Sequence, residues 1–280
     1  MNRTIIAADS SCDLSPEQKE RYGIRITPLH VIMGQRQCLD GVDVQANELY
    51  DYFDATGELP KTAANTPGEY EDFFRSLTAD GSEAVHISLS AEFSSTYRNA
   101  CLAAEEVPGV YVVDGRNLST GSGLLALKAA DMAAAGLPAG EIAEKLTALA
   151  QKVDASFVLD TLAYLRAGGR CSSVAAIGTS MLSLKPGIVV EDGKMHVGKK
   201  YMGNLAKCLQ KYAADRLSGV EVDDTRVFVT HTRMDPALVE TIKKQVADTG
   251  LFKEVLESTA GATVASHCGP NCLGVLFIRK

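Results

Sequence analysis

The sequence lacks any concentration of positive charge. Its 280 residues hold 28 Lys and Arg against 35 Asp and Glu, which gives a formal net charge of −7 and a pI near 5.3. The basic residues are dispersed along the chain, whereas domains that bind DNA, RNA or anionic membranes carry a basic patch or stripe. The composition therefore argues against nucleic acid as a partner.

Long hydrophobic runs and cysteine motifs are also missing. The apolar stretch at residues 5–8 meets Asp9 after four residues, far short of a signal peptide or a membrane span. We therefore expect no membrane insertion and a cytoplasmic protein. The seven cysteines are scattered without a Cys-x-x-Cys pair, which indicates reduced thiols packed as small hydrophobes. A zinc site at His267, Cys268 and Cys272 lacks a fourth ligand at recognisable spacing, so no metal is expected.

Nucleotide-binding loops are poorly represented. No Gly-Lys-Ser/Thr occurs, and the only dinucleotide-like pattern is G-x-G-x-x-A at residues 121–126. That pattern should follow the first strand of its sheet directly, yet residues 115–120 separate it from the fourth expected strand. Small residues that allow close helix packing explain it better. A nucleotide- or cofactor-dependent α/β enzyme remains an alternative, which tight NAD or ATP binding would support.

What is present is an alternation of apolar runs and helical patterns. Strands are expected at residues 4–8, 24–33, 84–89 and 110–113, and helices begin at capping signals around Ser15 and Thr66. This order predicts an α/β fold with an N-terminal parallel sheet flanked by helices, residues 1–155. The carboxyl ends of its strands should bring together Asp9, the segment 88–95 and Asp114.

The second half changes character near residue 156. Helical patterns at 121–135 and 139–153 precede it, and beyond it we expect a hairpin over 187–197, a helix at 204–217 and strands near 226–230 and 274–278. Residues 156–280 are therefore predicted to form a C-terminal α+β domain with a mixed sheet and helices on one side.

Residues 88–97 place several hydroxyls at a strand-to-helix turn. A helix start offers free N–H groups and the positive end of the helix dipole, which favour an anion. Because no Lys or Arg precedes Arg98 and no glycine is present, a carboxylate fits better than a nucleotide. The simpler interpretation is an ordinary Ser/Thr helix cap.

Two further residues are candidates for a polar site. His267 ends the strand-like run 263–268 before a Gly-Pro turn, and it is either a site residue or a structural histidine. Arg170 follows Gly168-Gly169 and either neutralises an anion or pairs with a local acid. Ser94 and His267 could also form a nucleophile and base oriented by Asp160, although the Gly-x-Ser-x-Gly elbow is missing.

Taken together, these segments resemble the DegV family of bacterial fatty-acid-binding proteins over nearly the whole chain. The order and spacing of the matching stretches are specific: 8–15, 40–43, 62–70, 88–97, 113–114 with 119–123, 157–170, 184–186 and 267–270. The resemblance implies two domains and one long-chain fatty acid, its carboxylate at the domain interface and its acyl chain in a buried tunnel. Carried over by position, the carboxylate ligands are Thr62, Ser94, the N–H of Ser95, His267 and a supporting Arg170.

The resemblance also implies a carrier and not an enzyme. In family members that serve a fatty acid kinase, the bound acid is presented for phosphorylation, and the carrier does no chemistry. Two positions depart from the family pattern: Ser95 stands where glycine is usual, and Met202 stands where an arginine linked to kinase docking is common. We therefore expect a non-catalytic fatty-acid-binding monomer without cofactor and treat the kinase as a possible partner. A serine esterase or thioesterase-like hydrolase using Ser94 and His267 is the alternative.

Overall fold

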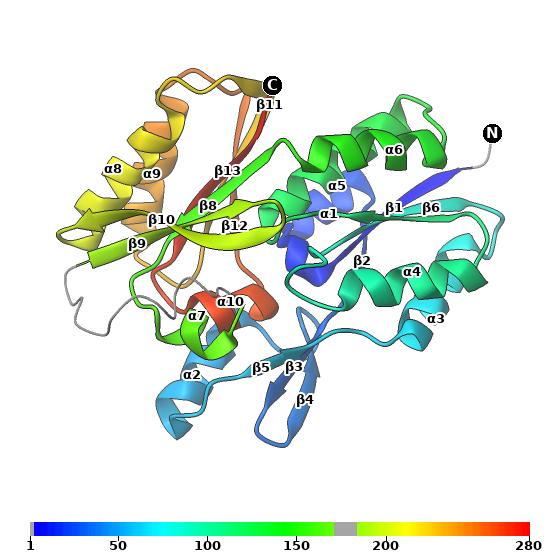
Figure 1. The fold of residues 1–280 in the computed structure, drawn as a ribbon, viewed down its shortest axis with the longest axis horizontal. Helices are drawn as coiled ribbons and strands as arrows, with labels where there is room; N and C mark the ends of the chain where they lie inside the picture. Colours follow the sequence, from blue (N-terminus) through cyan, green and yellow to red (C-terminus); the bar gives the residue numbers. More distant parts are fainter. Residues whose placement is uncertain (1–2, 171–183) are drawn as a thin grey trace.

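A parallel four-stranded sheet forms the centre of the N-terminal half (Figure 1). In the computed structural model, which describes residues 3–170 and 184–280, the strands are β1 (Thr4–Asp9), β2 (Arg25–Thr27), β6 (Glu83–Ser88) and β7 (Val110–Asp114), in the order β2-β1-β6-β7. Helices α3 (Pro67–Thr78) and α4 (Thr96–Glu106) cover one face, and α5 (Thr120–Ala134) and α6 (Ala139–Ala150) cover the other. The predicted α/β class is confirmed. Cys171 lies outside the described residues.

Local capping chemistry sets the starts of two helices. Ser15 begins α1 (Pro16–Tyr22), and Thr66 begins α3, each with a complete capping box and a proline at the start of the helix. The side-chain oxygen of each cap accepts a backbone N–H of the first turn, which would otherwise lack a partner. Both predicted starts are therefore confirmed. The 3-10 turn η1 (Ser10–Cys12) connects β1 to this region.

The C-terminal half is built on a mixed six-stranded sheet, as expected. Its order is β10-β9-β8-β13-β11-β12, and only the β11–β12 pair is parallel. The strands are β8 (Val153–Val158), β9 (Leu184–Glu191), β10 (Lys194–Met202), β11 (Val222–His231), β12 (Glu254–Thr259) and β13 (Leu273–Arg279). The expected hairpin turns at Asp192 and Gly193, both with positive φ. Helices α8 (Leu205–Leu217) and α9 (Pro236–Ala247) cover one face.

The single strand expected over residues 24–33 is wrong. The chain forms β2, then breaks at Pro28, whose ring removes a donor and restricts the residue before it. It continues as β3 (His30–Met33) in a separate antiparallel sheet of order β4-β3-β5, with β4 (Arg36–Leu39) and β5 (Lys61–Ala63). Helix α2 (Ala46–Thr56) shares a core with this third sheet.

The strand-like interpretation of residues 263–268 is also wrong. These residues form helix α10 (Ala262–Cys268), which starts at Gly261 and ends at Gly269. The helix packs against α2, β3, β5 and α7 (Ala163–Gly168), so it lies where the third sheet meets the C-terminal half. A mostly small and buried run this short does not distinguish a strand from a helix.

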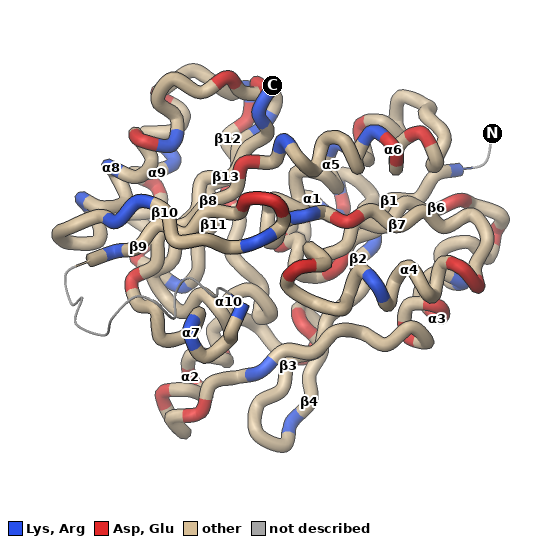
Figure 2. The backbone as a smooth tube through the Cα atoms, in the orientation of Figure 1, with Lys and Arg blue, Asp and Glu red and all other residues tan. Residues whose placement is uncertain are grey.

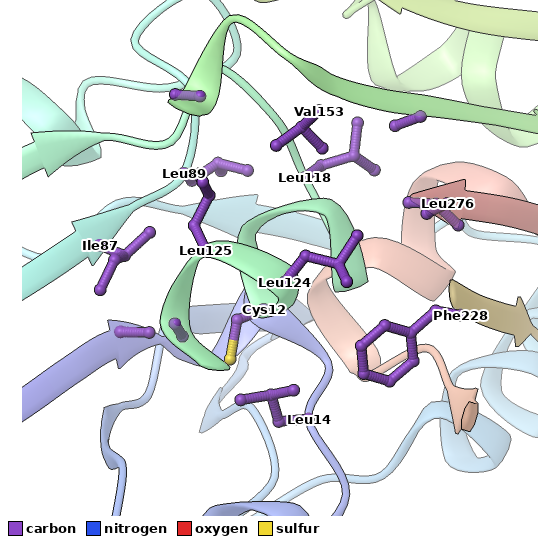
Figure 3. Packing of buried hydrophobic residues seen from close by; sticks show 14 of the residues in the cluster. Cys12, Leu14, Ile87, Leu89, Leu118, Leu124, Leu125, Val153, Phe228 and Leu276 are labelled. Atoms are coloured by element: carbon purple, nitrogen blue, oxygen red, sulfur yellow. The ribbon is translucent and has the colours of Figure 1, made fainter. Parts of the chain in front are cut away.

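The two halves share one hydrophobic core. Figure 3 shows Leu124 of α5 on the side of Phe228 and Leu276 from the six-stranded sheet, whereas Leu125 lies beside Leu89 and Ile87 of the N-terminal half. A small residue of α5 allows close packing against η1, because a methyl group at Gly123 would lie 2.8 Å from the backbone oxygen of Cys12. The packing interpretation of the pattern at residues 121–126 is therefore supported. Figure 2 shows Lys and Arg interspersed with Asp and Glu along the chain.

Within residues 3–170 and 184–280, no helix combines the length and the apolarity that crossing a membrane requires.

Candidate functional site

A cavity of about 70 Å³ lies between the carboxyl end of the parallel sheet, the third sheet and the C-terminal half. Four of the predicted site residues line it: Thr62 from β5, Ser94 before α4, Arg170 after α7 and His267 from α10. They come from positions as distant as 62 and 267 in the sequence. Ser95, the fifth predicted residue, is exposed and does not line the cavity.

The polar lining residues form one continuous group. Thr62 Oγ1 lies 3.0 Å from His267 Nε2, within hydrogen-bond distance. The imidazole packs against the backbone of Gly168, whose carbonyl accepts a hydrogen bond from Arg170 Nη1 at 2.6 Å. Arg170 Nε donates to the carbonyl of Phe93, the residue before Ser94, at 3.5 Å. The structure therefore brings the four side chains to one wall.

Burial keeps the imidazole of His267 neutral at pH 7. Its pKa falls from 6.5 to about 4, first because burial penalises the imidazolium form and second because the Arg170 guanidinium is near. Nε2 faces Thr62, and Nδ1 is buried without a partner in the described parts of the chain. A methyl group at Gly168 would lie 2.1 Å from Nδ1, so only glycine permits this approach.

The side chain of Ser94 bonds the first residue of α4 and also lines the cavity. Its Oγ accepts the N–H of Thr96 at 3.2 Å and lies 2.6 Å from Thr96 Oγ1. The N-cap position itself is Ser95, whose side chain makes no capping hydrogen bond, so the ordinary Ser/Thr cap expected here is not formed. Ser94 instead satisfies one N–H at the helix start from a place on the cavity wall.

The catalytic alternative is not assembled in this geometry. His267 Nε2 is bonded to Thr62, and Ser94 Oγ is bonded to Thr96, and no hydrogen bond joins Ser94 to His267 in the described residues. Asp160, the expected orienting acid, accepts hydrogen bonds from Lys185 and Asn271. Asp160 therefore does not orient His267 in this structure, as the hydrolase alternative would require.

The sequence correctly predicted that polar residues at the strand ends lie together, but it did not indicate that Asp9 supports the turn at residues 88–95. Asp9 Oδ2 accepts the N–H of Leu89 at 2.8 Å and the hydroxyl of Ser88 at 3.0 Å, and Asp114 Oδ1 accepts the N–H of Ala91 at 3.3 Å. These carboxylates hold the start of the turn that leads to Ser94. Asp9 is thus a supporting residue of the site, signalled by an acid at the end of a buried strand.

Two further hydroxyl residues, Ser11 and Thr263, line the cavity, and the remaining lining residues are apolar and come from many segments. They include Leu29, Leu89, Phe93, Leu118, Leu165, Met195 and Val264. A second cavity of about 30 Å³, lined by residues of the C-terminal sheet, shares Leu118, Val264 and Cys268 with the first. No sequence signal could identify this set, because the positions are set by tertiary packing alone. In the described residues, no group of three or more His, Cys, Asp or Glu could hold a metal ion.

Acid is expected to destabilise the protein through His267. Because the folded-state pKa is lowered from 6.5 to about 4, the unfolded chain binds a proton first as the pH falls. The buried neutral imidazole makes its full contribution to the free energy of unfolding above pH 6.5. This contribution, at most about 3 kcal/mol, is lost as the pH falls from 6.5 to about 4. Urea unfolding of wild type and His267→Gln across pH 4–7.5 measures this loss. The exposed His196→Gln is the control, and equal pH slopes for all three proteins would contradict the expectation.

Comparisons with known proteins agree on one family over the full chain. A family model described as an uncharacterised protein of the DegV family matches residues 3–280. A DegV domain-containing protein of Caldanaerobacter subterraneus is 30% identical over 284 residues, covering 100% of both chains. The structure of a DegV family protein from Thermus thermophilus, reported as fatty acid binding, has a TM-score of 0.88 at 26% identity and covers 99% of this chain and 100% of its own. A stearic-acid-binding protein from Eubacterium ventriosum has a TM-score of 0.84 at 29% identity, covering 100% and 99%.

Proposed function

Because this chain belongs to the DegV family, we propose that it binds one long-chain fatty acid and does not transform it chemically. The observation that carries the proposal is the cavity at the junction of the two halves, where a neutral imidazole and four hydroxyl residues adjoin an apolar wall. Such a wall suits a ligand with one polar end and a long hydrocarbon.

The polar wall offers hydrogen bonds suited to a carboxylate. Burying a carboxylate is costly unless its oxygens are saturated or its charge is neutralised. Thr62 and Ser94 supply hydroxyls, His267 supplies an imidazole, and Arg170 supplies a nearby positive charge. A carboxylate bound here would raise the pKa of His267 toward its ordinary value.

The apolar wall supplies most of the expected affinity. Each buried methylene contributes roughly 0.8 kcal/mol, so a chain of about sixteen to eighteen carbons needs no second polar contact. We propose that the acyl chain runs from the first cavity into the second. Leu118, Val264 and Cys268 belong to both cavities and would have to separate to let the chain pass.

The test of the proposal is direct recovery of the ligand. Purified protein is denatured, and the organic extract is examined by mass spectrometry. A fatty acid of fourteen to twenty carbons in a one-to-one ratio is expected. An empty extract, combined with no calorimetric binding of added palmitate or oleate, would overturn the proposal. Labelling of Ser94 by a fluorophosphonate probe would instead favour the hydrolase alternative.

Removing a polar side chain of the site is expected to weaken binding. Ser94→Ala or His267→Ala leaves a buried carboxylate oxygen short of a donor, which costs about 1–3 kcal/mol of binding free energy. Titration of palmitate by calorimetry measures the loss. Ser95→Ala keeps the backbone N–H and should bind like wild type. Unchanged affinity in both site variants would mean that the carboxylate is bound elsewhere.

Presentation of the bound acid to a fatty acid kinase is the finer part of the proposal. It is supported by the family resemblance and by exposure of the β10 strand, where Met202 has 77% of its surface accessible. Because Met202 replaces an expected arginine, we expect Met202→Arg to strengthen kinase association without changing fatty acid affinity. Co-purification with a bacterial fatty acid kinase measures this association. Equal recovery of the kinase with wild type and with Met202→Arg would count against docking at this position.

A further inference from the structure

Two buried carboxylates of the N-terminal half meet the first turn of α10. Asp40 Oδ1 accepts the N–H of Ala262 at 2.8 Å, and Asp40 Oδ2 accepts the N–H of Thr263 at 3.2 Å. Asp13 Oδ1 accepts the N–H of Gly261 at 2.8 Å. Asp13 and Asp40 are 5% and 3% exposed, and neither lines the cavity. The first N–H groups of α10 therefore find their partners in a different part of the fold.

Each carboxylate is itself held by a hydroxyl group. Ser10 Oγ donates to Asp40 Oδ2 at 2.9 Å, and Ser119 Oγ bonds Asp13 Oδ2 at 2.5 Å. Gly261 permits both acids to approach, because a Cβ there would lie 3.1 Å from Asp13 Oδ1 and 3.2 Å from Asp40 Oδ1. The start of α10 is thus fixed relative to the parallel sheet and the third sheet.

The two acids can share this place because burial disfavours the charged form of Asp13. Burial raises the pKa of Asp13 to about 8, and the neighbouring charge of Asp40 adds to the rise. Gly261 and Ser119 oppose the rise by hydrogen bonding, and Lys19 opposes it by its charge. Asp13 is therefore only partly ionised at neutral pH. The charge that remains at the start of α10 is favourable there.

His267 follows Thr263 by four positions along α10, which is about one helical turn. A displacement of the first turn of α10 would therefore move the imidazole by a similar amount. At 3.0 Å, the Thr62–His267 contact tolerates little movement. We propose that Asp13 and Asp40 are positioning residues of the carboxylate site, which hold α10 where His267 meets Thr62. That the ligand is a fatty acid rests on the proposed function, whereas the role of the two acids in placing His267 does not.

The test compares Asp40→Ala and Asp40→Asn by two measurements. We expect Asp40→Ala to lower palmitate affinity at least tenfold and to shift the imidazole NMR resonances of His267 in ligand-free protein. Asp40→Asn keeps one oxygen that accepts an N–H of α10, so both effects should be partly restored. This second variant also preserves side-chain volume, which keeps the comparison usable should the alanine variant unfold.

Asp154→Ala is the matched control. Asp154 is a buried acid of β8 that binds Arg216 and Arg279, away from the cavity. It should lower the melting temperature while leaving the His267 resonances and palmitate affinity unchanged. Unchanged resonances and affinity in folded Asp40→Ala, or equal shifts in Asp154→Ala, would overturn the positioning role. Absence of palmitate binding by wild type would instead contradict the proposed function, and the resonance comparison would still test positioning.

Discussion

Replacing Gly168 with alanine is expected to lower fatty acid affinity at least about tenfold, or about 1.4 kcal/mol. The added Cβ would lie 2.1 Å from His267 Nδ1 and 2.9 Å from its Cε1, so the imidazole must move by more than an ångström. That movement breaks the 3.0 Å contact between His267 and Thr62. Calorimetric titration of palmitate measures the loss of affinity.

The backbone itself does not oppose this substitution. Gly168 is the last residue of α7 and does not have a positive φ, so alanine fits the conformation. Gly68→Ala is the matched control, because it adds the same methyl group to helix α3, where no atom of the described residues lies within 4 Å. The control should bind normally. Wild-type affinity in Gly168→Ala, with the His267 resonances shifted, would show that the imidazole does not bind the ligand.

The sequence carries enough local information to predict most elements of the fold. Capping boxes at Ser15 and Thr66 and the turn at Asp192-Gly193 are encoded within four residues, and the structure confirms all three. The third sheet and α10 were missed for a different reason. Pro28 divides one apolar run between two sheets, and α10 depends on capping by Asp40, 222 residues before Ala262. Such distant partners leave no local pattern.

The polar part of the candidate site was more predictable than its apolar part. Hydroxyls at a strand-to-helix turn and a histidine before a Gly-Pro turn carry chemistry in their identity, and Thr62, Ser94 and His267 do line one cavity. The assignment of Thr62 came through family resemblance, because a threonine in a short edge strand has no distinguishing signal. Residues such as Met195 and Leu118 are ordinary core residues until the fold brings them together.

Replacing Asp9 with alanine is expected to have the largest effect on stability. Its carboxylate lies within hydrogen-bond distance of Tyr70 Oη at 2.6 Å and His86 Nε2 at 3.1 Å, in addition to its bonds with Ser88 and Leu89. Asp9 is 1% exposed, so removing its side chain leaves buried polar groups without hydrogen-bond partners and creates a cavity. The expected loss in the free energy of unfolding is about 3–5 kcal/mol, measured by urea denaturation.

Asp114→Ala is the control that shows whether any acid at a strand end stabilises the fold as much as Asp9 does. Asp114 ends the neighbouring strand β7 and accepts the N–H groups of Ala91 and Arg116, but it is only half-buried, so we expect a loss of about 1 kcal/mol. A comparable loss in both variants would contradict a special role for Asp9. Because Asp9 holds the N–H of Leu89, a cavity residue, folded Asp9→Asn should also bind palmitate more weakly than Asp114→Ala. Stability and binding are thus coupled through one buried carboxylate, which fixes the turn where the ligand's head group is expected to lie.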